Sequence, residues 1–344
     1  MLGMLAFMGA IFFGFLIDKG LARHMAVAAS VTMCFTLMML SLSTKYYQVM
    51  LTQGVLMGIC SSILFCCAIG SVAPYFTTRR GIALGLMASG SSIGGIVYSI
   101  TTQKLLAEVG FEWTCRINGF IVLATGCSTG LLFKPRIDSR KPLGRSYFAW
   151  ECLREPEWMM YCFAMMFAFI GYYIFYFYFQ TYAEKKLPDV ASFKYLTAIL
   201  SVGSLIGRII PSYYSDKIGI FNILFPTGVL SSVVSFCWIA ATNKGGILAV
   251  GILYGVVSAP ITVAPGAVAA LLTHDMSRLG IRISFTFFFF GLGVLLGAPF
   301  AGMIIRQHGE LGAQLYCALA WVAAAALFAA SRLWQTGPRL IVKR

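Results

Sequence analysis

The chain has 344 residues, of which 59% are hydrophobic and only 11% are charged, and its formal net charge is +14. A soluble protein of this length carries charge on about a quarter of its residues, so the composition excludes an ordinary soluble protein. The basic residues lie in short segments between long apolar runs, which indicates membrane topology rather than a nucleic-acid-binding surface.

Apolar runs long enough to cross a bilayer recur along the whole chain. Each needs a helix, because a helix satisfies its own backbone hydrogen bonds inside lipid. The sequence therefore predicts an all-α membrane protein with about 11 transmembrane helices. In chain order, the predicted spans are 1–17, 25–43, 47–72, 81–103, 115–133, 158–180, 193–214, 222–242, 246–272, 282–305 and 311–333.

The longest polar segment, 134–157, divides these spans into an N-terminal half, 1–133, and a C-terminal half, 158–344, which ends in a short tail. Most of the 26 lysines and arginines fall in one set of alternate loops, and this set includes segment 134–157 and the C-terminal tail. Because basic loops are retained in the cytoplasm, we expect a cytoplasmic linker and a cytoplasmic C-terminus. An odd number of spans then places Met1 outside.

The fourth span has a distinctive beginning, YFTTRRGIALGLMASGSSIG from Tyr75 to Gly94. The two aromatic residues suit the headgroup level, and Arg79 and Arg80 indicate a cytoplasmic border. Glycines in the following helix allow another helix to approach closely. The alternative is an ordinary spanning helix with a charged end. The predicted packing glycines of this helix are Gly85, Gly90 and Gly94.

Two short loops resemble each other. GFLIDKGLARH follows the first span, and GRIIPSYYSDKIGIFN follows the seventh, so Asp18 and Asp216 occupy matching places in the two halves. Each aspartate is followed by lysine and, soon after, by glycine. Internal repetition of this kind is typical of secondary transporters.

The Asp-Lys-Gly loops resemble the signature loop of the major facilitator superfamily. The stretch from Tyr75 to Gly94 resembles a helix signature of its monocarboxylate transporters, and further matches at 207–211 and 277–302 extend the resemblance to the fungal branch of that group, over essentially the whole chain. The resemblance implies two pseudo-symmetric helical halves, with the family's first helix absent from the N-terminal half. It is compatible with carriers of short carboxylates, vitamins or exported secondary metabolites.

Arg208 is the basic residue that the spans place inside the membrane, where a charge is costly and usually functional. We predict that it binds a substrate carboxylate through two parallel donors. The alternative is that it extends to the cytoplasm beside Asp216. Monocarboxylate transporters commonly have an aspartate one turn before this arginine, whereas this chain has Ser204, which puts proton coupling through such a pair in doubt. Ser204 is itself predicted to bind the substrate, together with Arg208.

The segment GYYIFYFYFQTY, 171–182, is dense in aromatic residues. Tyr173 and Tyr176 are candidates to line a substrate cavity, because helical spacing lets several such residues share a face. The alternative is an aromatic belt at the outer interface, and we expect this for Tyr178, Phe179 and Tyr182.

The resemblance also implies a cytoplasmic gate, in which each aspartate loop contacts the start of a helix from the other half. Such pairs would hold the gate closed in one state and release it in the other. Simple helix capping by the same carboxylates is the alternative. The predicted gating residues are Asp18 near Arg278 and Arg282, and Asp216 near Arg79 and Arg80.

Prolines and glycines of the last spans complete the predicted set. Pro260 and Pro265 interrupt backbone hydrogen bonding and permit bending. Gly297 and Pro299 are expected in a tightly packed helix.

These features predict a secondary transporter of a small organic anion, similar to a monocarboxylate, that works by alternating access. Proton-driven efflux of a secondary metabolite or drug is one alternative, and an inactive truncated relic is another. No enzymatic motif is recognisable, so we expect no enzyme, no cofactor and no metal. The expected partners are a small-molecule substrate, with or without a co-transported proton, and the lipid bilayer, but no nucleic acid. We expect a monomer in the plasma membrane, with the vacuole or another internal membrane as alternatives.

Overall fold

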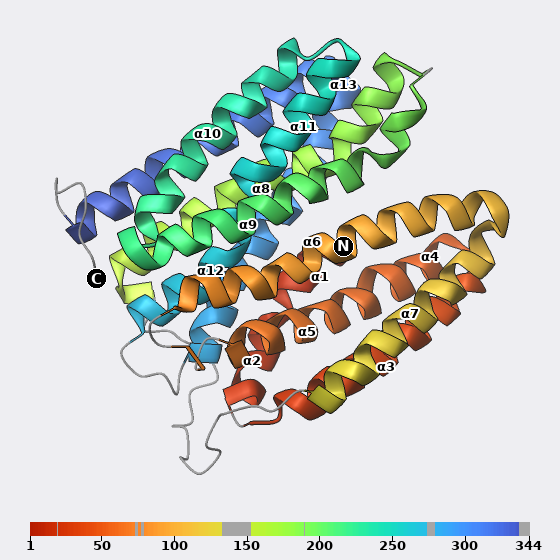
Figure 1. Cartoon of the computed structure of the whole chain (residues 1–344), viewed down its shortest axis with the longest axis horizontal. Coiled ribbons are helices and arrows are strands. Elements are labelled where there is room, and N and C mark those ends of the chain that lie inside the picture. Colours follow the sequence, from red (N-terminus) through yellow and green to blue (C-terminus); the bar gives the residue numbers. More distant parts are fainter. Residues whose placement is uncertain are drawn as a thin grey trace. The chain divides into compact units, whose positions relative to one another are not determined.

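The computed structural model describes residues 1–18, 20–72, 75–76, 79–132, 153–188, 190–273 and 279–336. Every regular element in these ranges is a helix (Figure 1). The predicted all-α class is thereby confirmed. The helices are α1 (Leu2–Met8), α2 (Ala10–Asp18), α3 (Ala22–Ser41), α4 (Tyr46–Val49), the π-helix η1 (Met50–Leu56), α5 (Met57–Val72), α6 (Arg80–Glu108), α7 (Gly110–Leu132), α8 (Pro156–Lys186), the 3₁₀ helix η3 (Ala191–Tyr195), α9 (Leu196–Ile218), α10 (Phe221–Ala240), α11 (Lys244–Ser258), α12 (Pro260–Leu272) and α13 (Leu279–Thr336).

Eight helical segments in the described part are long and apolar enough to cross a membrane. One of them, Leu279–Trp334, covers two of the predicted spans. Within it, Gly309 has a φ of 74° and interrupts the helical backbone of α13. All the predicted spans coincide with helical segments, but the number of membrane crossings, about 11, stays a prediction.

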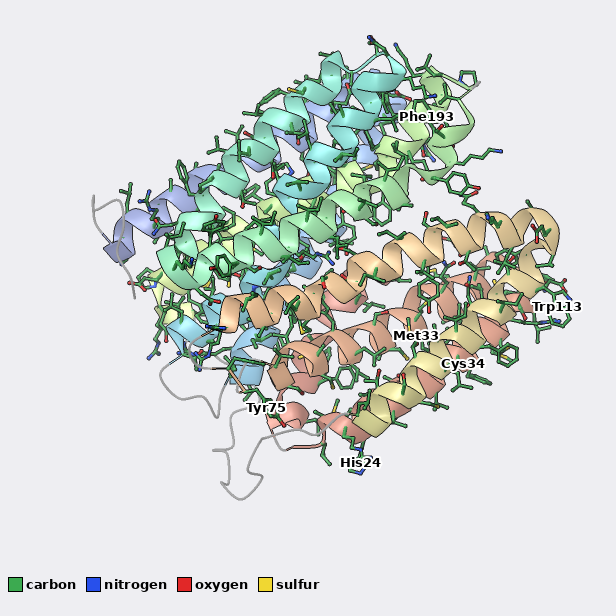
Figure 2. The ribbon with its side chains drawn as sticks, viewed as in Figure 1. His24, Met33, Cys34, Tyr75, Trp113 and Phe193 are labelled. Carbon is green, nitrogen blue, oxygen red and sulfur yellow. The ribbon has the colours of Figure 1, made fainter. Side chains whose placement is uncertain are left out.

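The surface of these helices is strongly apolar. Large side chains such as Phe12, Phe120, Ile210 and Leu319 are more than half exposed. On a soluble protein such apolar surface would mark a binding site or an aggregation risk, whereas on a spanning helix it faces lipid. At the start of α7, Trp113 projects outward (Figure 2), and the Arg116 guanidinium lies 5.1 Å from the centre of its ring.

The chain forms two compact units. The first unit comprises Met1–Thr77, Thr101–Glu151 and Ala269–Gly291, and the second comprises Thr78–Ile100, Cys152–Val268 and Leu292–Arg344. The first 21 residues of α6, up to Ile100, thus belong with the later helices. The predicted division into 1–133, 134–157 and 158–344 stays a prediction, since residues 133–152 lie outside the described part.

The first unit is built on close helix contacts and an aromatic cluster. Helix α3 packs along α7, where Gly126 leaves room for the Ser30 side chain. The ring of Phe7 lies 5.7 Å from that of Phe65 and 6.0 Å from that of Phe287, centre to centre. The described core of this unit is therefore apolar, and the small residues of α7 let the neighbouring backbone approach.

The second unit has a core of large rings from α8, α10, α11 and α13. The Phe175 ring stacks on Tyr254 with centres 3.6 Å apart, and Trp238 and Trp321 are almost completely buried. Our expectation of an interfacial aromatic belt is wrong for Phe179 and Tyr182. Phe179 is fully buried, and the Tyr182 hydroxyl donates to the Ala241 carbonyl at 3.2 Å, because this face of α8 packs inside the bundle.

The two Asp-Lys-Gly loops share a backbone feature. Gly20, after α2, has a φ of 82°, and Gly219, after α9, has a φ of 89°. Residues with a side chain rarely adopt such angles, so glycine is the natural residue for ending a helix in this way. The equivalent ends of α2 and α9 are consistent with the internal repeat that the sequence predicts.

Candidate functional site

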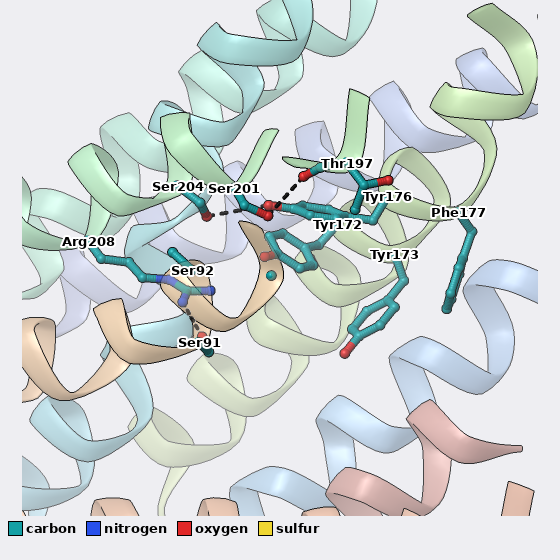
Figure 3. Close-up of a pocket in the computed structure, with 11 residues that line it drawn as sticks. Ser91, Ser92, Tyr172, Tyr173, Tyr176, Phe177, Thr197, Ser201, Ser204 and Arg208 are labelled. Carbon is teal, nitrogen blue, oxygen red and sulfur yellow. Dashed lines mark hydrogen bonds between the residues drawn. The ribbon is translucent and has the colours of Figure 1, made fainter. Parts of the chain in front are cut away.

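A cavity of about 410 Å³ lies in the second unit, between α6, α8 and α9. Helix α6 contributes small residues, α8 contributes aromatic rings, and α9 contributes hydroxyl groups and one guanidinium (Figure 3). A volume in this range suits a small organic molecule. The cavity is lined by Ser91, Ser92, Gly95, Tyr172, Tyr173, Tyr176, Phe177, Thr197, Ser201, Ser204 and Arg208.

Close packing of α9 against α11 positions the polar face of α9. A Cβ atom on Gly203 or Gly207 would collide with the backbone of α11 at Ile252 or Val256. On the other side of this contact, a Cβ on Gly255 would collide with the Leu200 carbonyl. Glycines spaced by four residues let two helix backbones touch directly. This contact fixes α9 and turns the side chains of Ser204 and Arg208 towards α6 and α8.

Helix α6 approaches α9 just as closely on another face. A Cβ on Gly85 would lie 2.6 Å from the Ser212 Cβ, and a Cβ on Gly95 would lie 2.7 Å from the Ser201 Oγ. These glycines are ten residues apart along α6, so the contact runs beside the cavity over several turns. The cavity therefore lies beside α9 and two helices that contact it, α6 and α8.

Arg208 is buried, with only 6% of its surface exposed. Its Nη1 donates to the Ala88 carbonyl at 2.5 Å and to the Ser91 hydroxyl. Its Nε is buried and has no hydrogen-bond partner among the residues that the structure describes. Among the described residues, no carboxylate oxygen lies within 4.0 Å of the guanidinium. The protein therefore holds this positive charge with two neutral acceptors and leaves part of its donor capacity unused.

A wall of aromatic rings from α8 faces the same cavity (Figure 3). The Tyr172 and Tyr176 rings stack with centres 4.5 Å apart, and the Tyr173 and Phe177 rings are tilted at 5.5 Å. These pairs follow from the spacing of four residues along a helix. Such a wall presents flat apolar faces and phenolic hydroxyls side by side, a combination that suits an amphipathic ring compound.

Hydroxyl groups fill the space between the rings and the guanidinium. The Tyr176 hydroxyl donates to the Ser204 Oγ at 3.3 Å, which ties α8 to α9. The Ser201 hydroxyl donates to the Thr197 carbonyl at 2.8 Å. The Ser92 Oγ is buried and has no partner among the described residues. Ser92 and Arg208 therefore both offer unused hydrogen-bonding capacity beside the cavity.

The structure brings the four predicted substrate residues, Arg208, Tyr173, Tyr176 and Ser204, into this one cavity. Their role in binding stays a prediction. Sequence reasoning did not identify the contribution of α6. The sequence shows a helix rich in glycine and serine, to which Ser91, Ser92 and Gly95 belong. It does not show which neighbouring helix the face with these three residues contacts.

Asp216, at the end of α9, has a different environment. Its carboxylate accepts hydrogen bonds from the backbone N–H groups of Gly81 at 2.6 Å and Ile82 at 3.0 Å. These are free donors in the first turn of α6, which begins at Arg80. Asp216 thus caps α6, as one of the two sequence interpretations expected, and it makes no ion pair with any described residue. Arg79 is exposed beside this contact.

The second predicted gate, around Asp18, lies largely outside the described residues. Arg278 lies outside the described residues, and so does the side chain of Asp18. The Arg282 Nη1 donates to the Leu272 carbonyl at 3.0 Å. The predicted pairing of Asp18 with Arg278 and Arg282 therefore stays a prediction.

The predicted packing glycines differ from one another. Gly85 makes the close contact with α9, and a Cβ on Gly297 would lie 3.1 Å from the Ile170 Cα in α8. Gly90 and Gly94 do not make the expected contact, since a Cβ at Gly90 would meet no described atom within 4 Å and one at Gly94 only Tyr98 of the same helix. At 100° per residue, they lie about 140° and about 180° around α6 from Gly85. Pro299 lies inside α13, close to Gly297.

Comparison with known proteins supports a transporter. The sequence profile of the Major Facilitator Superfamily matches residues 1–246. The agnestins efflux protein AgnL12 of Paecilomyces divaricatus is 32% identical over 321 residues, which are 93% of this chain and 73% of that protein. The MFS-type transporter dbaD of Emericella nidulans is 35% identical, over 86% of this chain and 66% of that protein. The aspyridones efflux protein apdF, also from Emericella nidulans, is 30% identical, over 82% of this chain and 58% of that protein. This chain thus spans between 58% and 73% of the length of these relatives.

Two solved structures show the same fold at low sequence identity. The human organic anion transporter MFSD10 aligns with a TM-score of 0.72 and 12% identity, over 95% of this chain and 82% of that one. The fucose:proton symporter FucP of E. coli aligns with a TM-score of 0.69 and 15% identity, over 96% of this chain and 90% of that one.

Proposed function

Because the chain belongs to the Major Facilitator Superfamily, a family of membrane transporters, we propose that it is a secondary carrier that exports an amphipathic organic acid. The substrate binds in the cavity between α6, α8 and α9, with its acidic group at Arg208 and its ring against the tyrosines of α8. This proposal joins the organic-anion substrate that the sequence predicts with the efflux direction that it gave as an alternative.

The observation that carries the proposal is the buried guanidinium of Arg208, which has no carboxylate within 4.0 Å in the part of the chain that the structure describes. A buried charge with an unsatisfied donor is costly, by about 1–3 kcal/mol for the lost hydrogen bond alone. An anionic ligand supplies both the opposite charge and the missing acceptor, and guanidinium groups bind carboxylates through parallel hydrogen bonds. The unused Ser92 hydroxyl gives the same ligand a further donor or acceptor.

The aromatic wall supports a ring-containing substrate. Tyr172, Tyr173, Tyr176 and Phe177 offer stacked and tilted ring faces over one side of the cavity. A short aliphatic monocarboxylate would leave most of this wall and most of the 410 Å³ unused. A flat molecule with one acidic group fits the guanidinium and the rings together.

The direction of transport is proposed from the relatives. Two of them are named efflux proteins, one for agnestins and one for aspyridones. These names favour export of a metabolite over uptake of a small monocarboxylate. Export from the cell also favours the plasma membrane as the place of action. The resemblance to the monocarboxylate branch, and the absence of the family's first helix, stay predictions.

We also propose that the contact between Asp216 and α6 acts in the conformational cycle. The carboxylate accepts hydrogen bonds from two N–H groups at a helix N-terminus, where a negative charge is favourable. These donors need another partner, such as water, when the contact opens. The contact therefore stabilises the state in which it is formed, and its strength sets the rate of leaving that state.

The proposal is tested first in cells. Cells with and without the gene are compared by mass spectrometry of the medium and of the cell contents. We expect at least one aromatic acid to be retained inside cells that lack the gene, and to be released again by the wild-type gene but not by Arg208→Gln. An exometabolome that does not depend on the gene, or a compound that is retained only when the gene is present, would contradict export.

The second test is binding to the purified full chain. We expect naphthalene-2-sulfonate and 2-naphthoate to stabilise the protein against thermal unfolding, and the neutral 2-naphthamide to do so far less. The arginine control is Arg306→Gln, because Arg306 is exposed in α13 and lies outside the cavity. Equal stabilisation by the anions and the amide would show that Arg208 does not select for charge.

A further inference from the structure

The acidic residues and histidines of this chain are few, and those in the described part lie near helix ends or a helix break. The chain has only 12 aspartates and glutamates and three histidines. Every aspartate, glutamate and histidine in the described part lies within about one turn of a helix end or beside the break at Gly309. The other acidic residues and histidines lie in sequence between the described helices: Asp138, Glu151, Asp189, His274 and Asp275.

The described surroundings of Arg208 likewise contain no acidic side chain. From α6 it meets the Ala88 carbonyl and the Ser91 hydroxyl. From α8 it faces only phenols as titratable groups, those of Tyr172, Tyr173 and Tyr176. On its own helix, the nearest carboxylate is Asp216, two turns away.

Two further observations complete this environment. The Asp216 carboxylate is engaged by the N–H groups of Gly81 and Ile82. The packed helix α11 contributes Lys244, at its first residue, and Tyr254, whose hydroxyl donates to the Gly171 carbonyl. In water, phenols and guanidinium groups both titrate well above physiological pH. The described lining of the cavity contains no carboxylate and no histidine, the side chains that most often carry protons in transporters.

We infer that the carrier is an anion exchanger, in which Arg208 changes sides only with an anion bound and the chain carries no proton. This inference rests on the proposed function, since it concerns the same cavity. A guanidinium group keeps its charge in proteins, and among the described residues no carboxylate oxygen lies within 4.0 Å of Arg208. A buried charge without a partner is strongly unfavourable. Without an anion, the conformational change that returns the binding site to the first side of the membrane is therefore slow. A second anion, bound on the other side, makes this change faster.

The test uses the purified full chain in liposomes and labelled naphthalene-2-sulfonate. This probe keeps its negative charge at every usable pH, so it cannot bring a proton with it. We expect uptake into liposomes preloaded with the unlabelled probe to be at least about tenfold faster than into liposomes that contain only gluconate, because the return stroke is then compensated. An imposed pH gradient or a protonophore should change the rate by less than about twofold, because no carboxylate or histidine is among the described residues that line the cavity.

Different failures overturn different statements. If the uptake is not reduced by Arg208→Gln, or if no uptake occurs, the proposed anion carrier falls and the exchange mechanism falls with it. If an Arg208-dependent uptake occurs without preloading and is driven by the pH gradient, the carrier stands and the exchange inference is wrong.

A charge introduced beside Arg208 tests the physical cause. Ser204 lies one turn before Arg208 on α9 and is almost fully buried, so the carboxylate of Ser204→Asp can pair with the guanidinium. We expect the ratio of preloaded to unloaded uptake to fall towards one in this variant, and its flux to become pH-dependent.

The matched control is Ser204→Asn, which has the same size without the charge. The flux of this variant is expected to fall, but its ratio of preloaded to unloaded uptake should stay close to that of the unchanged protein. Equal ratios for the two variants would contradict the inference. If the aspartate variant does not fold, as judged by gel filtration in detergent, the liposome experiment on the unchanged protein decides alone.

Discussion

Helix α9 carries one charged side chain in its middle and another near its end, and the protein satisfies the hydrogen bonding of the two to different extents. In the middle, Arg208 is buried among rings and hydroxyls, with two neutral acceptors and an unused Nε. At the end, Asp216 receives two backbone N–H groups from the first turn of α6. Asp216 is satisfied by the protein itself, whereas Arg208 has capacity left for a ligand. The comparison separates a residue that stabilises one conformation from a residue that binds a substrate.

The largest expected effect follows from removing the charge in the middle of α9. We expect Arg208→Gln to weaken binding of naphthalene-2-sulfonate by about a hundredfold, because losing one partner of a buried charge pair costs about 2–5 kcal/mol. Arg208→Lys keeps the charge but not the two parallel donors, so the affinity of this variant for the probe should lie between those of the unchanged protein and Arg208→Gln. Isothermal titration on the purified protein measures both. Similar affinities for all three proteins would mean that the acidic group binds elsewhere.

The next effect tests whether α9 must lie directly against α11 to present Arg208. Gly207→Val places a side chain where the Val256 carbonyl lies, so one helix must shift. Overpacking of this kind costs about 1–3 kcal/mol, and we expect a lower midpoint of thermal unfolding together with weaker probe binding. Gly90→Val is the matched control, because no described atom lies within 4 Å of a Cβ at Gly90. Equal midpoints for the two variants would contradict this account of the contact.

A smaller effect is expected at the end of α9. Asp216→Asn keeps an oxygen acceptor but removes the charge, so the two hydrogen bonds to α6 weaken by about 1 kcal/mol. We expect turnover in liposomes to change about fivefold while the dissociation constant stays nearly constant. The control is Glu184→Gln, another carboxylate near a helix end, which accepts from the Gln180 amide at 2.9 Å. A loss of affinity with normal turnover would place Asp216 in binding instead.

Much of the fold could be predicted from the sequence, because long apolar runs leave the backbone no alternative to helices. Arg208 and the tyrosines of α8 could be identified for a related reason: a charge or a dense row of hydroxylated rings inside a span needs a function. Which helices surround them could not be predicted. The glycines of α6 illustrate this, since Gly85 and Gly95 contact α9 while Gly90 and Gly94 lie on other faces.

The error at Phe179 and Tyr182 has the same origin. Aromatic residues near the end of a span suit an interface, but these two pack inside the second unit beside Trp238, at ring distances of 5.6 Å and 5.8 Å. Composition gives the depth of a residue in the membrane, whereas the direction in which it points depends on neighbours that are distant in sequence.

The smallest effect concerns the hydroxyl that links the two walls of the cavity. Tyr176→Phe keeps the ring stacked on Tyr172 but removes the donor to the Ser204 Oγ. One neutral hydrogen bond contributes about 0.5–1.5 kcal/mol, so probe affinity should fall about two- to tenfold. Tyr178→Phe, on the same helix but outside the cavity, removes the hydrogen bond to the Ala298 carbonyl and should lower thermal stability without changing affinity. If both variants changed only stability, the Tyr176 hydroxyl would be a structural group, and the ligand would be held at the α9 side by Arg208 alone.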